Sequence, residues 1–260
     1  KFFIFVRFFT FKLEKIFKKA LSYLYYCYFA VVYIFFSTIL APFIFCLVLG
    51  KGKYKVAQKI KFFWAKWMMF FVGIHYDIKT EFAIPFNQPY IICPNHKSYL
   101  DIVLMYLIIP HDFAFIGKSE LLRWPVIRFF FKRGVDIPVY RDSISKAAKC
   151  LAIAEEELKK GRSIVIFPEG GWDNEPGMRR FKNGAFQLAI DAKVPVLPIT
   201  FKNNYSLFTD HKDLSGNAKP GIANIVIHKP IETKNLSRKE LVSLREQTFN
   251  IIQSELNREN

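Results

Sequence analysis

The pattern of apolar and charged positions divides the chain into two parts near residue 80. In the first part, aromatic and basic residues lie on both sides of a long apolar segment. From about residue 85, short apolar runs alternate with longer amphipathic stretches. This alternation is typical of an α/β domain with a largely parallel sheet flanked by helices.

The apolar runs predict strands at residues 90–93, 113–116, 135–139, 163–167, 194–200 and 222–228. Helical patterns predict helices at residues 99–109, 119–132, 143–160, 178–192 and 236–257. We therefore assign residues 80–260 to an α/β domain and residues 1–79 to a membrane-anchoring, membrane-inserted helical region.

The apolar segment, residues 20–50, has no charged residue over 31 positions. As a helix it would be about 46 Å long, against roughly 30 Å of bilayer hydrocarbon. We expect Ala41-Pro42 to break it. One interpretation is a single tilted transmembrane helix, and another is a hairpin that enters the membrane and returns. Residues 51–79 continue with interleaved lysines and aromatic residues and resemble an interfacial amphipathic helix.

The distribution of charge indicates a membrane partner. The formal net charge is +16, and residues 1–79 contribute +11 of it through thirteen Lys and Arg residues and two acids. Each basic residue near anionic lipid is worth about 1 kcal/mol. Because this charge flanks an apolar segment, we expect membrane lipids and no nucleic acid as partners. We expect the protein at the inner cell membrane, with the α/β domain on the cytoplasmic side.

A histidine and an aspartate follow the first predicted strand, five positions apart: His96 and Asp101. On one ideal helix they would point about 140° apart, so they meet only if His96 precedes the helix and Asp101 reaches back from its first turns. Pro94 fits that boundary. If the two meet, the carboxylate orients the imidazole, and His96 can act as a general base. Alternatively, His96 is a loop histidine and Asp101 a helix-start acid.

A second predicted strand, residues 163–167, also ends in proline and then presents Glu169, Gly170 and Gly171. In parallel sheets the ligand crevice lies outside the carboxyl ends of the strands, so both segments are expected to face one crevice. The glycines would allow backbone N–H groups to approach a ligand closely. The alternative is an ordinary turn.

These segments resemble blocks of the 1-acylglycerol-3-phosphate acyltransferase family of membrane glycerolipid synthesis. The family's Asn-His-x4-Asp block is met by Asn95, His96 and Asp101, and its Phe-Pro-Glu-Gly block by residues 167–170. Residues 117–125, 134–141 and 194–199 resemble three further blocks, so the resemblance spans residues 95–199 in the right order. One departure is Gly171-Trp172, where many members have Thr-Arg and the arginine is thought to hold the substrate phosphate.

The resemblance implies an acyltransferase in which His96 deprotonates an acceptor hydroxyl and Asp101 orients His96. The acceptor would be 1-acylglycerol-3-phosphate, and the acyl donor acyl-CoA or an acyl-carrier protein. Glu169 would hold the acceptor's glycerol or shape the loop, and backbone N–H groups near Gly170 and Gly171 are candidates for the oxyanion site. The candidates for holding the phosphate are Lys118, Arg141, Arg179 and Arg180, with Lys182 as a further possible replacement for the missing arginine.

We expect no cofactor and no metal for this reaction. The four cysteines have no close paired spacing, so the sequence predicts neither a zinc site nor a disulfide framework. Two other functions stay open. One is acylation of another hydroxyl-bearing lysolipid, such as an aminoacyl lipid, by the same residues. The other is a non-catalytic membrane lipid carrier, against which the intact His96/Asp101 pair argues.

Overall fold

A seven-stranded sheet forms the centre of this computed structural model, with the strand order β1-β7-β6-β2-β5-β3-β4. The residues that the structure describes are 2–49, 54–85, 87–123, 128, 131–140, 143–171, 177–209 and 217–258. The strands are β1 (Ile74–Thr80), β2 (Ile91–Pro94), β3 (Phe113–Lys118), β4 (Ile137–Val139), β5 (Ser163–Val165), β6 (Val196–Phe201) and β7 (Gly221–Ile227). All pairs are parallel except β6 with β7, so β1 and β7 run opposite to the other five strands.

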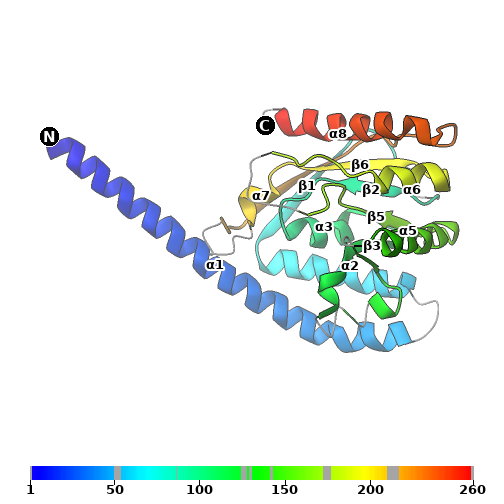
Figure 1. The fold of residues 1–260 in the computed structure, drawn as a ribbon. Coiled ribbons are helices and arrows are strands. Elements are labelled where there is room, and N and C mark those ends of the chain that lie inside the picture. Colours follow the sequence, from blue (N-terminus) through cyan, green and yellow to red (C-terminus); the bar gives the residue numbers. More distant parts are fainter. Residues whose placement is uncertain are drawn as a thin grey trace.

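Helices cover both faces of the sheet (Figure 1). They are α1 (Phe2–Leu49), α2 (Tyr54–Phe71), α3 (Leu100–Ile108), α5 (Ile144–Lys159), α6 (Gly184–Ala192), α7 (Asn204–Leu207) and α8 (Leu241–Asn257). Successive strand residues point to opposite faces. Accordingly, Ile92 packs in a core with α1, α2 and α3, while Ile91 and Cys93 pack in a second core with α5, α6 and α8. The predicted α/β class with a mostly parallel sheet is confirmed.

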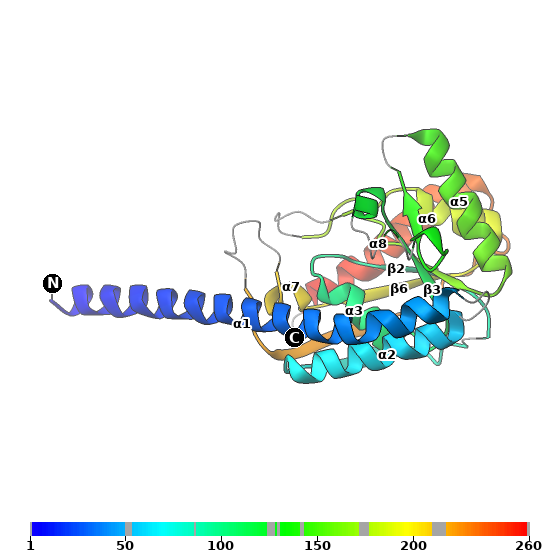
Figure 2. The same ribbon diagram turned by 90° about the horizontal axis from the view of Figure 1, so that it is seen from below.

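Among its described side chains, helix α1 contacts the body from Ser22 onward, since Ser22 Oγ accepts from Ala218 N at 2.7 Å. Figures 1 and 2 show its N-terminal half projecting away from the body and its C-terminal half lying beside α2. The two helices are antiparallel, because Tyr28 Oη donates to Phe71 O at 2.6 Å while Tyr33 packs edge-on against Trp64. Residues 13–43 make one helix that is long and apolar enough to cross a membrane, by length and composition.

The break that we expected at Ala41-Pro42 is wrong, because Pro42 lies inside α1. Proline removes one i→i−4 hydrogen bond, and the apolar residues on both sides keep the helix continuous. Helices α1 and α2 run in opposite directions, and residues 50–53 between them lie outside the described residues.

Strand β1 was not predicted, because it is an edge strand in which only Ile74 is fully buried. The segment that we expected to be one interfacial helix ends as α2 at Phe71, and Gly73 then turns the backbone with φ 68°, a value that glycine adopts readily. The sheet thus begins six residues before the boundary that we placed at residue 80.

Two predicted helices begin differently from what we expected. The one expected at residues 119–132 opens with a 3-10 turn, η1 (Ser119–Arg123), and residues 124–127 and 129–130 lie outside the described residues. The one expected at residues 178–192 begins only at Gly184. The backbone before it bonds to the turn after β5 instead, since Lys182 N donates to Pro168 O at 2.8 Å. A second 3-10 turn, η2 (Arg238–Glu240), precedes α8.

Candidate active site

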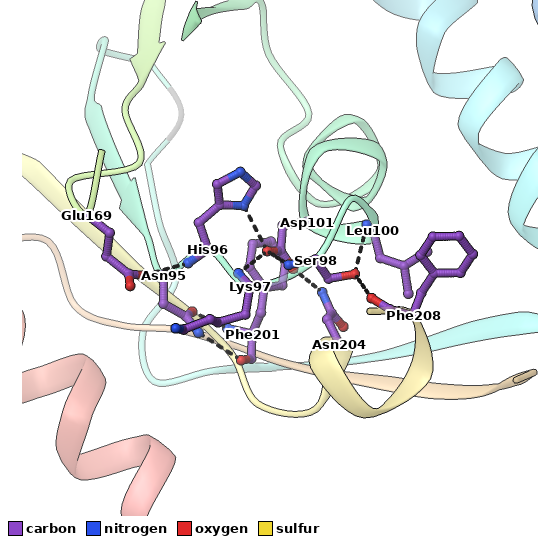
Figure 3. Close-up of polar contacts among 10 residues, drawn as sticks. All are labelled: Asn95, His96, Lys97, Ser98, Leu100, Asp101, Glu169, Phe201, Asn204 and Phe208. Carbon is purple, nitrogen blue, oxygen red and sulfur yellow. Dashed lines mark hydrogen bonds and ion pairs between the residues drawn. The ribbon is translucent and has the colours of Figure 1, made fainter. Parts of the chain in front are cut away.

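The structure brings His96 and Asp101 together at the carboxyl end of β2. His96 lies in the loop after the strand, and Asp101 is the second residue of α3. His96 Nδ1 lies 2.9 Å from Asp101 Oδ2 (Figure 3). The same oxygen accepts hydrogen bonds from the backbone N–H groups of Lys97 and Ser98, each at 2.9 Å. The turn therefore folds around the carboxylate, which explains how residues five positions apart can meet.

The end of β6 and the segment after it hold this loop from the other side. Asn204 Nδ2 donates to Asp101 Oδ1 at 2.7 Å. The Asn95 amide pairs with the backbone of Phe201, donating to its carbonyl at 3.0 Å and accepting from its N–H at 2.7 Å. Ser98 Oγ donates to Phe208 O at 2.5 Å. The loop is thus fixed by residues more than 100 positions away in the chain.

His96 is buried, and its ring stacks on Phe167 with centroids 3.7 Å apart and an interplanar angle of 16°. Burial lowers the pKa of His96 below its usual 6.5, the hydrogen bond and charge of Asp101 oppose that shift, and the Lys118 charge lowers the pKa further. The imidazole is therefore neutral at neutral pH. Because Asp101 accepts from Nδ1, it favours the tautomer whose lone pair is on Nε2. That is the protonation state that a general base requires.

Glu169 joins the two loops of the site. Its Oε1 accepts from His96 N at 2.7 Å, and its Oε2 accepts from Arg179 N at 2.8 Å. Burial raises the pKa of Glu169 to about 7, although these two hydrogen bonds oppose the shift. Since both oxygens bind backbone N–H groups, the arrangement favours a role in shaping the loops over direct contact with an acceptor's glycerol.

The turn after β5 supplies less to an oxyanion site than we expected. Gly170 and Gly171 have φ values of 75° and 136°, which the tight turn requires. However, the Gly170 N–H donates to Phe167 O at 3.0 Å, so the turn itself uses it. The Lys182 side chain lies over Gly170, because a Cβ added there would be 2.8 Å from Lys182 Cε.

The basic residues that we named as candidates for phosphate binding differ in their contacts with the site. Lys118 is exposed at the end of β3, and its charge acts on His96. Arg179 is exposed, and its Nη1 lies 3.5 Å from Gly171 O. Arg180 is exposed beside it. Arg141 and Trp172 lie outside the described residues.

No metal centre is found in the described part of the chain, where His, Cys, Asp and Glu side chains form no group of three or more that could hold a metal ion.

Asn204 is the site residue that sequence reasoning missed. It stands in a four-residue helix, 103 positions after Asp101, and its neighbour Asn203 makes the segment look like an ordinary turn. The stacking of Phe167 on His96 was also missed, although Phe167 was recognised as part of a family block. No local sequence pattern indicates either contact.

Comparison with known proteins places this site in a family. The model of the family described as "Acyltransferase" matches residues 75–202, which include His96, Asp101 and Glu169. Residues 75–202 belong to the acyltransferase family. The resemblance inferred from the sequence blocks is thereby confirmed.

Curated relatives of this chain carry one recurring name. A chloroplastic 1-acyl-sn-glycerol-3-phosphate acyltransferase of Brassica napus is 32% identical over 145 residues, covering 56% of this chain and 41% of that protein. A putative 1-acyl-sn-glycerol-3-phosphate acyltransferase of Caenorhabditis elegans is 31% identical over 172 residues, covering 65% and 64%. The mouse alpha enzyme of that name is 29% identical over 180 residues, covering 66% and 60%. The chain thus spans less than two thirds of the length of these relatives.

A solved structure shares the fold. The 1-acyl-sn-glycerophosphate acyltransferase PlsC of Thermotoga maritima matches with a TM-score of 0.72 and 24% identity, over 95% of this chain and 99% of that one.

Proposed function

We propose that this protein is a membrane-bound O-acyltransferase that moves a fatty acyl chain onto the free hydroxyl of 1-acylglycerol-3-phosphate, giving phosphatidic acid in phospholipid biosynthesis. The observation that carries the proposal is the buried His96–Asp101 pair at 2.9 Å, at the carboxyl end of β2 in an acyltransferase-family domain. The names of the relatives support the choice of acceptor.

The chemistry follows from the neutral imidazole. His96 Nε2 takes the proton of the acceptor hydroxyl while its oxygen attacks the thioester carbonyl, and Asp101 stabilises the resulting imidazolium. The tetrahedral intermediate then collapses and the carbon–sulfur bond breaks. The leaving thiolate takes the proton from the His96 imidazolium, which restores the neutral imidazole. The products are the new ester and a free thiol. The donor is acyl-CoA or an acyl-carrier protein, and the reaction as proposed uses no cofactor and no metal.

The acceptor's phosphate requires cations at the mouth of the site. Lys118 is our first choice among the described residues because its charge already acts on His96. Arg179 and Arg180 are the next, since the Arg179 backbone is bound to Glu169. Arg141 remains a candidate from the sequence.

Helix α1 supports the membrane assignment. Val31, Ile34 and Phe35 are exposed on its surface, and the same helix packs through Phe29 into the core of the domain. Water contact costs an acyl chain about 0.8 kcal/mol per CH₂ group, so an enzyme that handles it belongs at a bilayer. We place the protein at the inner cell membrane, with the catalytic domain on the cytoplasmic side.

The test is an acyl-transfer assay with the full chain in detergent or vesicles, using labelled acyl-CoA and acyl-carrier protein as donors. The acceptors are lysophosphatidate, a neutral lysolipid and an aminoacyl lysolipid. We expect phosphatidic acid from the wild type and from the control His75→Ala, whose histidine is exposed on β1, and none from His96→Ala. Transfer to another lysolipid alone would disprove the acceptor. No transfer to any of them would disprove the function.

A further inference from the structure

Asn204 is placed to control the carboxylate of the His96–Asp101 pair. Its Nδ2 donates to Asp101 Oδ1 at 2.7 Å, and both side chains are almost fully buried, with exposed fractions of 2% and 1%. The other carboxylate oxygen, Oδ2, accepts from His96, Lys97 and Ser98. The two oxygens therefore have different tasks: Oδ2 serves the catalytic loop, and Oδ1 is held by α7.

The position of Asn204 is set by contacts that do not involve the pair. Asn203, the residue before α7, donates through Nδ2 to Ile222 O at 2.8 Å and accepts from Asn224 N at 2.8 Å, so the start of α7 is fixed to β7. At the other end, Phe208 packs against Phe29 of α1, with ring centroids 4.3 Å apart and planes tilted by 39°. The amide of Asn204 is thus carried by a rigid element, which is what a positioning group requires.

The Asn204 amide also carries a cost that an apolar residue would avoid. Its Oδ1 is buried and has no hydrogen-bond partner in the described part of the chain. A buried unpaired carbonyl oxygen is unfavourable. The contribution of Asn204 therefore lies in its N–H group, which is directed at Asp101 (Figure 3).

We infer that Asn204 is a positioning residue for acyl transfer: by holding Oδ1, it fixes the rotation of the Asp101 carboxylate so that Oδ2 faces His96 Nδ1. The carboxylate then keeps its charge in a buried site and selects a single tautomer of His96. This inference rests on the proposed function, in which His96 is the general base.

The kinetic test is a double-mutant cycle between Asn204→Leu and Asp101→Asn. Leucine has a similar volume and removes the donor. It also fills the place of Asn204 beside a cavity of about 350 Å³ that both Asn204 and Asp101 line, whereas alanine would leave room for a water at the freed oxygen. We expect Asn204→Leu to lower kcat about 10- to 100-fold with unchanged KM for donor and acceptor, because a hydrogen bond to a charged group is lost.

In the Asp101→Asn background, the same change should lower kcat by less than about threefold, since residues that act as one unit are not additive. The matched control is Ser206→Ala, which removes the hydrogen bond from the exposed Ser206 Oγ to Asn203 O in the same helix without touching Asp101 or the anchor to β7. We expect it to leave kcat per folded molecule unchanged. Additive effects of Asn204→Leu and Asp101→Asn would overturn the inference, because they would mean that Asn204 acts through the general fold.

A second readout needs no substrate. With ¹⁵N-labelled histidine, the His96 signals are identified among the five histidines by their absence in His96→Ala. We expect one tautomer, with the proton on Nδ1, in the wild type and in Ser206→Ala, and a mixture of tautomers in Asn204→Leu. A single unchanged tautomer in Asn204→Leu would also overturn the inference.

If Asn204→Leu does not fold, Asn204→Met replaces it in both experiments. Methionine is flexible enough to fill the same space and donates no hydrogen bond, so kcat should again fall. Failure of the proposed function is seen separately: the wild type would then show no acyl transfer, while the tautomer measurement would still decide the role of Asn204.

Discussion

Replacing Asp101 by asparagine should separate the fold of the site from its chemistry. In the wild type four N–H donors reach this carboxylate, three at 2.9 Å on Oδ2 and the Asn204 amide at 2.7 Å on Oδ1. In Asp101→Asn, the side-chain oxygen can keep the place of Oδ2. The new amide group would then face Asn204, which can rotate its own amide by 180° and present Oδ1, an atom without a hydrogen-bond partner among the described residues.

The magnitudes of the two effects differ. With the network restored by that rotation, we expect Asp101→Asn to cost less than about 1.5 kcal/mol of unfolding free energy. Asp101→Ala leaves the donors without an acceptor, at about 1–3 kcal/mol each for buried groups, so we expect a loss of roughly 4 kcal/mol or more. Both changes remove the negative charge that stabilises the His96 imidazolium, so both should lower kcat by about 10²–10⁴.

The assay combines denaturant unfolding of the detergent-solubilised protein with single-turnover acyl transfer, in which chemistry limits the rate. Near-normal turnover of Asp101→Asn would refute the role of the charge. Equal stability of Asp101→Ala and the wild type would refute the hydrogen-bond network. If Asp101→Asn loses as much unfolding free energy as Asp101→Ala, the proposed rotation of the Asn204 amide is refuted.

Three further predictions concern pH, phosphate binding and the N-terminal helix. Because the pKa of Glu169 is raised from 4.5 to about 7, its contribution to stability is present below about pH 4.5 and is lost as pH rises to about 7. The unfolding free energy of the wild type relative to Glu169→Gln should therefore fall by roughly 3 kcal/mol across that range, and a flat difference would contradict the assigned pKa. Lys118→Ala should raise the KM for lysophosphatidate about tenfold. Because the Lys118 charge lowers the pKa of His96, the same change should raise that pKa and move the acidic limb of the pH–rate profile to higher pH. An unchanged KM together with an unchanged pH–rate profile would exclude Lys118 from the site. Deleting residues 1–20 should leave the melting temperature nearly unchanged, since the described side chains there are exposed. Deleting residues 1–55 removes Phe29 and Val32 from the core and should cause unfolding or aggregation. Equal melting temperatures of the two truncated proteins would contradict the packing of α1.

The sequence alone determined the class of the fold and the centre of the site. Parallel strands buried on both faces are continuous apolar runs, so β2, β3 and β6 could be predicted close to their bounds. The pairing of His96 with Asp101 could also be anticipated, because five positions and a proline leave one local way for the two to meet.

The tertiary structure alone decided the elements whose environment is not local. Strand β1 has a single fully buried residue, so its sequence carries no strand pattern, and its pairing with β7 makes it a strand. Helix α1 likewise continues through Pro42, although proline disfavours a helix interior and its propensity predicted a break there.

The supports of the site were decided by sheet order. Asn95 reaches Phe201, and Asp101 reaches Asn204, because β2 pairs with β6. Glu169 reaches His96 N because β2 also pairs with β5. Neither neighbour of β2 is adjacent to it in the chain. Local spacing can therefore identify the groups that carry out the chemistry, whereas the residues that orient them become neighbours only when the strands have assembled in this order.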